Sequence, residues 1–327
     1  MMEIKQIVIW GHKLHSHTHS YIHNGFYLGF KSLGYPVSWY DDSDDVSTID
    51  FSHSLFITEH QVNKKIPLRM DCLYLSHYVD EGDYKGVPKE NIIILKVTLR
   101  DFRDDPKDTL YTPIKGGQKY EYHSLIDGYQ CLYMYWATDL LPNEIDVNID
   151  RIVDIQNMRT NNVHFIGSVT NIWYILRELC IQNGIPFHQY GATFDKASVC
   201  NVSIEKNVEL IQSSLISPAL QADSQLMERY IPCRIFKNIS YGRMGMTNNP
   251  VVQDLFDEQL IYDTELIHLI QKGLDFELLP DKQEVVVKLM KHVRDNHTYL
   301  NRIHTIQTFI HTYTSFTLNT NKKDIRL

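Results

Sequence analysis

The stretch IKQIVIWGHKLHSHTHSYIHNGFYLGFKSLG, residues 4–34, decides how this chain folds. Its first part, Ile4 to Trp10, is an apolar run of strand length rich in β-branched residues, which is typical of a buried parallel strand. After a polar loop, apolar residues recur at helical spacing from Tyr21 to Leu33, and Gly34 follows as a stop signal. A strand, a loop and a helix in this order predict the first βα unit of a doubly wound α/β fold.

The second half of the chain repeats this plan. Val163 to Ile166 is strand-like, the loop GSVT follows, and Asn171 to Asn183 has helical spacing. Ile185 to Tyr190 then returns as a strand. We therefore predict two Rossmann-like domains, residues 1–150 and 151–312, followed by a tail at 313–327.

The regions around these two units are less regular. Further strands are expected at 36–40, 54–58, 71–77 and 91–97. Residues 99–127 are charged and rich in Pro and Gly, which indicates a flexible loop near a cleft. Apolar positions between Asp281 and about Thr312 predict one long or one kinked C-terminal helix, with packing against the first domain as an alternative.

Composition limits the classes of partner. The 327 residues contain 32 Lys and Arg against 40 Asp and Glu, a net charge of −8, which argues against nucleic acid and anionic membranes as partners. No apolar run reaches the roughly 18 residues of a transmembrane helix, and no signal peptide is visible. Five scattered cysteines without a CxxC pair read as reduced thiols. We expect a soluble, cytoplasmic protein.

The loop after the first strand is rich in histidine. In doubly wound sheets, ligands and catalytic groups gather at the carboxyl ends of the strands. A histidine here is a candidate general base for a hydroxyl. HSHTH also resembles the opening of amidohydrolase and PHP-type metal hydrolases, although no second HxH or clear DxH follows, and polar loop residues without a role are the third interpretation. The catalytic candidates are His15, His17 and His19, with the first two favoured as mid-loop residues.

Four other side chains are candidates for the wall of a cleft. Glu59 follows a predicted strand, Asp139 lies in the segment WATDLLP, and Trp136 stands beside the expected hinge. Together with His12 from the first loop, they form the expected acceptor-binding set. For each of the two acidic residues, a surface or helix-capping role is the alternative.

The segment Tyr230 to Gly245, YIPCRIFKNISYGRMG, reads as a loop that runs into a short helix ending on glycine. Unpaired N–H groups and the positive end of the helix dipole face outward at such a helix start. Arg234 beside them is suited to clamp phosphate oxygens with two N–H groups. An ordinary surface helix with scattered basic residues is the alternative.

With two Rossmann-like halves and this late segment, the chain resembles GT-B glycosyltransferases. That superfamily carries R-x-F-E-A-x-x-x-G at the nucleotide-sugar diphosphate. Arg234, Phe236 and Gly242 match, whereas Lys237 and Asn238 stand where an acidic residue and an alanine are frequent. The superfamily's contacts with the donor therefore cannot all be transferred to this chain, although Lys237 is able to neutralise phosphate.

More narrowly, residues 217–249 are similar to small glycosyltransferases of large DNA viruses and some bacteria, including exostosin-like enzymes of chlorovirus capsid glycans. The resemblance implies a nucleotide-sugar donor, with UDP favoured, in the C-terminal domain and a glycan acceptor in the N-terminal domain. It also implies that Gly167 and Ser168 approach the diphosphate through backbone amides, and that Ser217 and Gln221 lie near the nucleoside or sugar. The implied role is viral or surface glycan synthesis.

We expect direct displacement with inversion and without a metal or other cofactor, since cationic side chains and helix dipoles stabilise the leaving diphosphate. If configuration is retained instead, the histidine only binds acceptor. Two other classes stay open: a metal-dependent hydrolase that uses the HSHTH loop, and a nucleotide- or sugar-binding protein without catalysis.

Overall fold

The structure is a computed structural model that describes residues 1–15, 19–59, 61–77, 79–80, 82–98, 110–167, 171–190 and 202–318. The chain divides into unit 1, Met1–Asp139 with Tyr299–Leu327, and unit 2, Leu140–Thr298. These bounds differ from the expected 1–150 and 151–312. Helix α2 (Pro142–Asp150) lies in unit 2 because it packs against α10 (Lys282–Asn296), where Asp146 pairs with Arg294 at 2.7 Å.

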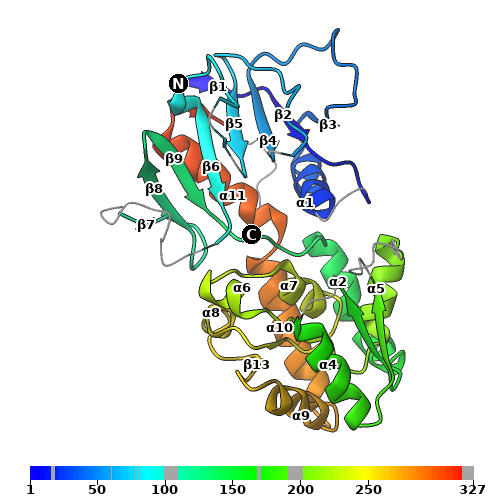
Figure 1. Ribbon diagram of the computed structural model, residues 1–327. Coiled ribbons are helices and arrows are strands. Elements are labelled where there is room, and N and C mark those ends of the chain that lie inside the picture. Colours follow the sequence, from blue (N-terminus) through cyan, green and yellow to red (C-terminus); the bar gives the residue numbers. More distant parts are fainter. Residues whose placement is uncertain are drawn as a thin grey trace. The chain divides into compact units, whose positions relative to one another are not determined.

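Unit 1 is built on an eight-stranded sheet in the order β3-β2-β4-β5-β6-β9-β8-β7 (Figure 1). Neighbouring strands run parallel from β3 to β9, and β8 and β7 are antiparallel. This mixed α/β class with a mainly parallel sheet is the predicted one. The strands are β2 (Gln6–Trp10), β3 (Val37–Tyr40), β4 (Ser54–Thr58), β5 (Leu73–Ser76), β6 (Ile92–Lys96), β7 (Thr112–Pro113), β8 (Tyr122–Ile126) and β9 (Tyr129–Tyr133).

Both faces of the central strands are buried. Val8, Phe56, Tyr74 and Ile92 are register partners in a row across the sheet and belong to one core cluster. The alternate positions, such as Ile9, Ile57 and Leu75, are also buried. A parallel sheet covered on both faces needs continuous apolar strands, which is why QIVIW and SLFIT contain so few polar residues.

Helix α1 (His19–Ser32) packs on β2 and on α11 (Tyr299–Tyr313). Two glycines permit this approach. A Cβ on Gly25 would lie 2.2 Å from the ring of Tyr299, and a Cβ on Gly29 would lie 2.7 Å from Ile303. The helix that carries His19 is thereby packed against a segment about 270 residues later in the sequence.

Three expectations about chain segments are corrected. The supposed loop at 99–127 contains β7 and β8, because Asp127 and Gly128 have positive φ (50° and 82°) and close a tight hairpin to β9. A tail was expected from residue 313, but the chain is still part of the fold at β14 (Phe316–Thr317), which pairs with β1 (Met2–Glu3).

The third correction concerns the C-terminal helix. In place of one long or kinked helix, α10 and α11 are separate helices, because the chain leaves helical conformation at His297 (φ −133°). Helix α11 belongs to unit 1 and α10 to unit 2.

Unit 2 contains the parallel pair β10 (Val163–Ile166) and β11 (Phe187–Tyr190) and the parallel pair β12 (Met246–Thr247) and β13 (Ile261–Tyr262). Its core includes Phe165, Leu176, Leu220, Met246 and Leu269. The remaining helices are η1 (Lys89–Asn91) in unit 1 and, in unit 2, α3 (Ile152–Asn157), α4 (Asn171–Gln182), α5 (Ile204–Ser213), α6 (Asp223–Met227), α7 (Cys233–Ser240), α8 (Pro250–Leu255) and α9 (Leu266–Phe276).

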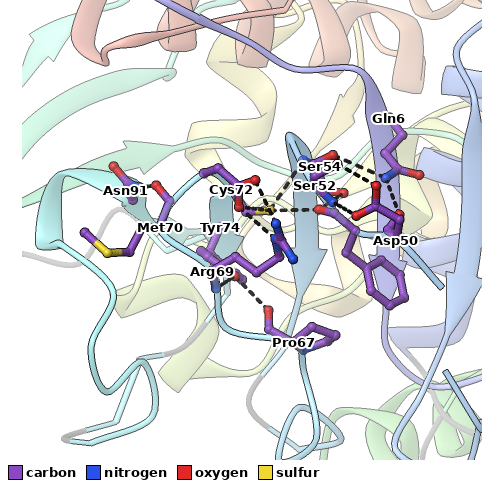
Figure 2. A network of polar contacts seen from close by, with 12 residues as sticks. Gln6, Asp50, Ser52, Ser54, Pro67, Arg69, Met70, Cys72, Tyr74 and Asn91 are labelled. Atoms are coloured by element: carbon purple, nitrogen blue, oxygen red, sulfur yellow. Dashed lines mark hydrogen bonds and ion pairs between the residues drawn. The ribbon is translucent and has the colours of Figure 1, made fainter. Parts of the chain in front are cut away.

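A polar network closes the amino ends of β4 and β5 (Figure 2). The Cys72 thiol donates to the carbonyl of Phe51 at 3.0 Å, and the Tyr74 hydroxyl donates to that of Pro67 at 2.7 Å. Arg69 binds Asp71 through two N–H groups at 2.7 and 2.9 Å. These bonds lie at the amino edge of the sheet, whereas His12, Glu59 and His77 follow the strands at the opposite, carboxyl edge.

Candidate active site

Ionisable side chains gather at the carboxyl edge of the unit 1 sheet. His12 comes shortly after β2, Glu59 directly after β4 and His77 directly after β5. His19 is the first residue of α1. Because the carboxyl ends of neighbouring parallel strands share one edge, these four side chains meet although they come from three separate segments of the chain.

The buried carboxylate of Glu59 is the centre of this group. His19 donates Nδ1–H to Glu59 Oε2, and the backbone N–H of His12 donates to Oε1 at 3.4 Å. The His12 Nε2 atom lies 3.8 Å from the same oxygen. Burial alone would raise the pKa of Glu59, but the His19 hydrogen bond and the charges of His23, His19 and His12 lower it to about 2. Glu59 is therefore ionised at neutral pH.

His23 lies one helical turn after His19 and is 4% exposed. Burial lowers its pKa to about 4, so the ring is neutral at pH 7. Its Nδ1 faces the carbonyl oxygen of His12 at 3.4 Å, and since a carbonyl only accepts, Nδ1 carries the proton. Gly11 is required beside this ring, because a Cβ there would lie 1.9 Å from a His23 ring carbon.

The depressed pKa of His23 makes stability depend on pH. Between pH 6.5 and 4, the His23 ring binds fewer protons in the folded protein than in the unfolded chain. The contribution of His23 to the free energy of unfolding is therefore complete above pH 6.5 and is lost as the pH falls to 4. We expect a loss of about 3 kcal/mol in the free energy of unfolding over this range, which His23→Asn removes.

Denaturant titrations at pH 7.5 and 4.5 measure this effect. The same substitution at His311, an exposed residue of α11, is the control and should keep the wild-type pH dependence. Equal pH dependence in wild type and His23→Asn would contradict the assignment.

A small pocket opens beside Glu59. Its polar lining includes His19, His23, Glu59 and His77. The His77 ring centre lies 5.3 Å from that of His19. The remaining walls are mostly apolar and are formed by Ile22, Phe26, Ile57, Leu95 and Trp136.

The structure brings together four of the seven candidates expected in unit 1: His12, His19, Glu59 and Trp136. His15 is exposed with φ at 69°, and its Nδ1 lies 3.3 Å from the Tyr21 hydroxyl, so it does not line the pocket. Asp139 ends the first segment of unit 1 and does not line it either. His17 is outside the described residues.

Sequence reasoning did not include His23 and His77 among the site residues. His77 ends a predicted strand, so the rule that singled out Glu59 applies to it as well. His23 stands four residues after His19, the spacing that places two side chains on one helical face.

The described part of the chain contains neither a group of metal ligands nor a membrane-spanning helix. Within the described residues, His, Cys, Asp and Glu side chains form no group of three or more suited to hold a metal ion. In the same part of the chain, every helix is too short or too polar to cross a membrane.

In unit 2, Arg234 occupies the first turn of α7. Its guanidinium carbon lies 4.6 Å from the centre of the Phe165 ring in β10. Gly167, just after β10, lies along its edge, since a Cβ there would be 2.2 Å from Arg234 Nη2. The Phe165 ring and the backbone of Gly167, which has no side chain, thus hold the guanidinium in place. Burial lowers the pKa of Arg234 because it disfavours the charged form.

Arg234 has no anionic partner within the described residues, and the nearby groups that favour its charge are only Cys233 and Tyr230. Arg243, nine residues on, is the contrast. It is fully buried, but it pairs with Glu277 at 3.0 Å and donates to the carbonyl of Leu215. Buried cations are normally paired in this way. Arg234, which is half-buried, has no such pair in the part of the chain that the structure describes.

Gly167 should be irreplaceable for this arrangement. Its φ of 153° disfavours any side chain, and a methyl group would displace Arg234. We expect Gly167→Ala to lower the free energy of unfolding by about 1–3 kcal/mol.

Gly184→Ala is the matched control for this change. Gly184 also has positive φ (68°), but a Cβ there meets nothing within 4 Å. It should therefore lose less stability than Gly167→Ala, as measured by denaturant unfolding. Equal losses of stability in the two variants would show that the contact between Gly167 and Arg234 adds no cost at residue 167.

The other donor candidates lie around α7. Asn238, four residues after Arg234, donates its amide to the carbonyl of Ser217 at 2.6 Å, so that amide holds the fold together. The Ser217 hydroxyl is buried and has no hydrogen-bond partner in the described part of the chain. Gln221 accepts from the amide of Asn249 and donates to the carbonyl of Tyr230, both at 2.5 Å. Lys237 lies in the same helix, and Ser168 is outside the described residues.

Comparison with known protein families and with curated proteins gives no match. Among solved structures, the chain is similar to one described as "alpha-glucosyltransferase (AGT) in complex with UDP". The TM-score is 0.53 at 10% sequence identity, and the match covers 94% of this chain and 99% of the other. At this identity the similarity shows the fold alone. Across nearly its whole length, the chain therefore has the fold of a glucosyltransferase whose structure was solved with UDP.

Proposed function

We propose that this protein is a glycosyltransferase that moves a sugar from a UDP-sugar to a hydroxyl group of a glycan acceptor. The observation that carries the proposal is Arg234, a cation that is held by Phe165 and Gly167 and has no counter-ion among the described residues. The shared fold with a UDP-bound glucosyltransferase supports UDP as the nucleotide. We place the chain among GT-B enzymes with two Rossmann-like halves, in viral or surface glycan synthesis.

Arg234 acts on the leaving group. When the bond between sugar and diphosphate breaks, negative charge builds on the diphosphate oxygens. A guanidinium donates two parallel N–H groups to such oxygens, and burial strengthens the attraction because water screens it less. The N-terminus of the eight-residue helix α7 adds backbone N–H groups and a positive dipole end. Lys237, one turn later, is proposed to add charge at the same diphosphate.

His19 acts on the acceptor. Because Nδ1 donates to Glu59, the neutral ring carries its lone pair on Nε2 and can take the proton of an attacking hydroxyl. The ionised Glu59 fixes this tautomer and stabilises the imidazolium that forms. His12 adds a backbone N–H that keeps the carboxylate in place.

The proposed reaction is a direct displacement with inversion. The acceptor oxygen forms the new bond to the anomeric carbon while the bond to the diphosphate breaks, and the acceptor proton passes to His19. The negative charge leaves with UDP and is stabilised by side chains, so the mechanism requires no metal ion. His19 lies in unit 1 and Arg234 in unit 2.

Thermal unfolding with nucleoside diphosphates tests the proposal. A ligand at 100 times its dissociation constant stabilises by about 2.7 kcal/mol, or roughly 5–10 °C in melting temperature. We expect UDP to give such a shift, ADP to give a smaller one, and UDP-glucose to release UDP when a glycan acceptor is added. If no nucleotide shifts the melting temperature, the proposal is wrong.

A further inference from the structure

Two histidines of unit 2 face each other at the end of α10. His292 lies near the C-terminus of the helix, and His297 is its C-cap residue. Their Nε2 atoms are 3.3 Å apart, and their ring centres are 5.1 Å apart. His297 is 1% exposed, so its side of the contact is shielded from water. The proposed reaction gives neither of these titratable side chains a role.

The contact between the two rings depends on where their protons are. A ring nitrogen that carries a proton donates a hydrogen bond, and one without a proton accepts. In the neutral pair, one ring is therefore the Nε2–H tautomer and the other is the Nδ1–H tautomer. One added proton can bind to Nδ1 of the donor ring without breaking the bond. A second added proton leaves an N–H on both Nε2 atoms, so the bond is lost and two cations face each other.

The pair packs against α7, the helix that carries Arg234. The ring of Phe236, two residues after Arg234, is fully buried, and its centre lies 4.7 Å from that of the His297 ring. Phe256, which follows α8, has its ring centre 5.3 Å from those of both histidines. Helix α7 has only eight residues, and so short a helix depends on tertiary packing for its stability. A change at the pair therefore acts on α7.

The charges around the pair set the direction of its response to pH. Burial lowers the pKa of His292 below its ordinary value of 6.5, and the carboxylates of Asp257 and Asp295 partly oppose this effect. Asp146 and Asp295 are both bound to Arg294. The other charged side chains on α2, α3 and α7, which pack on α10, are Glu144, Asp150, Asp154, Arg234 and Lys237. With a lowered pKa, the stability that His292 contributes is complete above pH 6.5 and is lost as the pH falls below it.

We propose that His292 and His297 form a pH-sensitive latch, which holds α7 in place while at least one Nε2 atom is unprotonated and releases it when both carry protons. Protonation of histidine clusters at pH 5–6 opens packed contacts in this way. The affinity of Arg234 for UDP then falls in acid, because an arginine on a loosened helix is no longer pre-organised. This inference adds a regulation of the donor site, and it rests on the proposed function for the identity of the ligand.

Nitrogen-15 NMR of the histidine rings tests the shared proton in the wild-type chain. At pH 8 we expect opposite tautomers, with Nε2–H in one ring of the pair and Nδ1–H in the other. Finding both rings in the same tautomer overturns the proposal, because two donors or two acceptors cannot form the bond.

Hydrogen exchange of the α7 amides tests the release. His292→Gln offers a donor and an acceptor in place of the ring nitrogen and does not titrate. Between pH 7.5 and 5.5, the protection of α7 should fall about two- to twelvefold more in the wild type than in this variant, the range for one net hydrogen bond. His268→Gln, at an exposed position of α9, is the matched control and should behave as the wild type. Equal falls in the wild type and His292→Gln, or a control that behaves as His292→Gln, overturn the latch.

Calorimetric titration of the same proteins with UDP tests the link to Arg234. Over the same pH range, the affinity for UDP should fall about two- to twelvefold more in the wild type than in His292→Gln. Protonation of UDP itself, whose terminal phosphate has a pKa of about 6, affects both proteins alike. An equal fall overturns the regulatory role. Absence of UDP binding at both pH values removes the proposed function instead, and the NMR and hydrogen-exchange results still decide the latch.

Discussion

Replacing Arg234 with alanine abolishes the UDP-dependent rise in melting temperature and lowers kcat with a UDP-sugar by about 10²–10³. The physical reason is that the guanidinium has no anionic partner of its own within the described residues, so its full attraction is available to the diphosphate. A hydrogen bond to a charged group contributes roughly 1.5–3 kcal/mol, and a guanidinium makes two. Thermal unfolding with and without UDP, and UDP release during turnover, measure the two effects.

The variant without ligand should be at least as stable as the wild type. The Arg234 charge is half-buried and has no counter-ion in the described part of the chain, so its removal relieves a desolvation cost. Removal of Arg243, by contrast, would deprive Glu277 of one of its ion pairs. Arg234→Lys should keep part of the UDP shift, since it retains charge without the planar fork. Arg177→Ala on the surface of α4 is the matched control. A normal UDP shift in Arg234→Ala refutes the assigned role.

Replacing His19 with alanine should lower kcat by about 10²–10⁴ and leave the UDP shift unchanged. The loss falls on kcat because His19 is proposed to take the acceptor proton only as the new bond forms. Glu59→Gln should lower kcat in the same direction. With a pKa of about 2, Glu59 carries a constant charge throughout the assay range, so its loss acts equally from pH 6 to 9.

Steady-state turnover of UDP-sugar at saturating acceptor measures this loss, with the exposed His311→Ala as the control. Turnover of His19→Ala above half the wild-type value would exclude His19 as the base. Loss of the UDP shift in the same variant would instead indicate a folding defect, which circular dichroism of the variant distinguishes.

The local order of strands and helices was predictable from sequence. Ile7 to Trp10 and Leu55 to Ile57 are continuous apolar runs because both faces of these strands are covered, and such runs are visible without any partner. The hairpin of β8 and β9 was missed although Asp127-Gly128 is a turn signal, because the charged, Pro- and Gly-rich segment before it obscured the pattern. The bounds of the two compact units differ from the expected ones, because α2 and α11 are assigned by what they pack against.

The sequence predicted which two segments carry the candidate site residues, but it did not predict the role of each residue within them. The first loop and the segment around Arg234 stood out by residue type alone. Among the loop histidines, however, nothing local distinguishes His15 from His19. The structure places His19 against Glu59 because α1 begins there and β4 ends opposite, while His15 turns to Tyr21.

The sequence by itself determined the α/β class and the presence of an arginine at a helix start. Only the tertiary structure decided that this arginine lacks a counter-ion within the described residues, while Arg243 nine residues later has one. The reason is physical. Hydrophobic periodicity and turn preferences act between neighbours in the chain, whereas the charge balance of a buried group depends on every segment that the fold brings within a few ångströms.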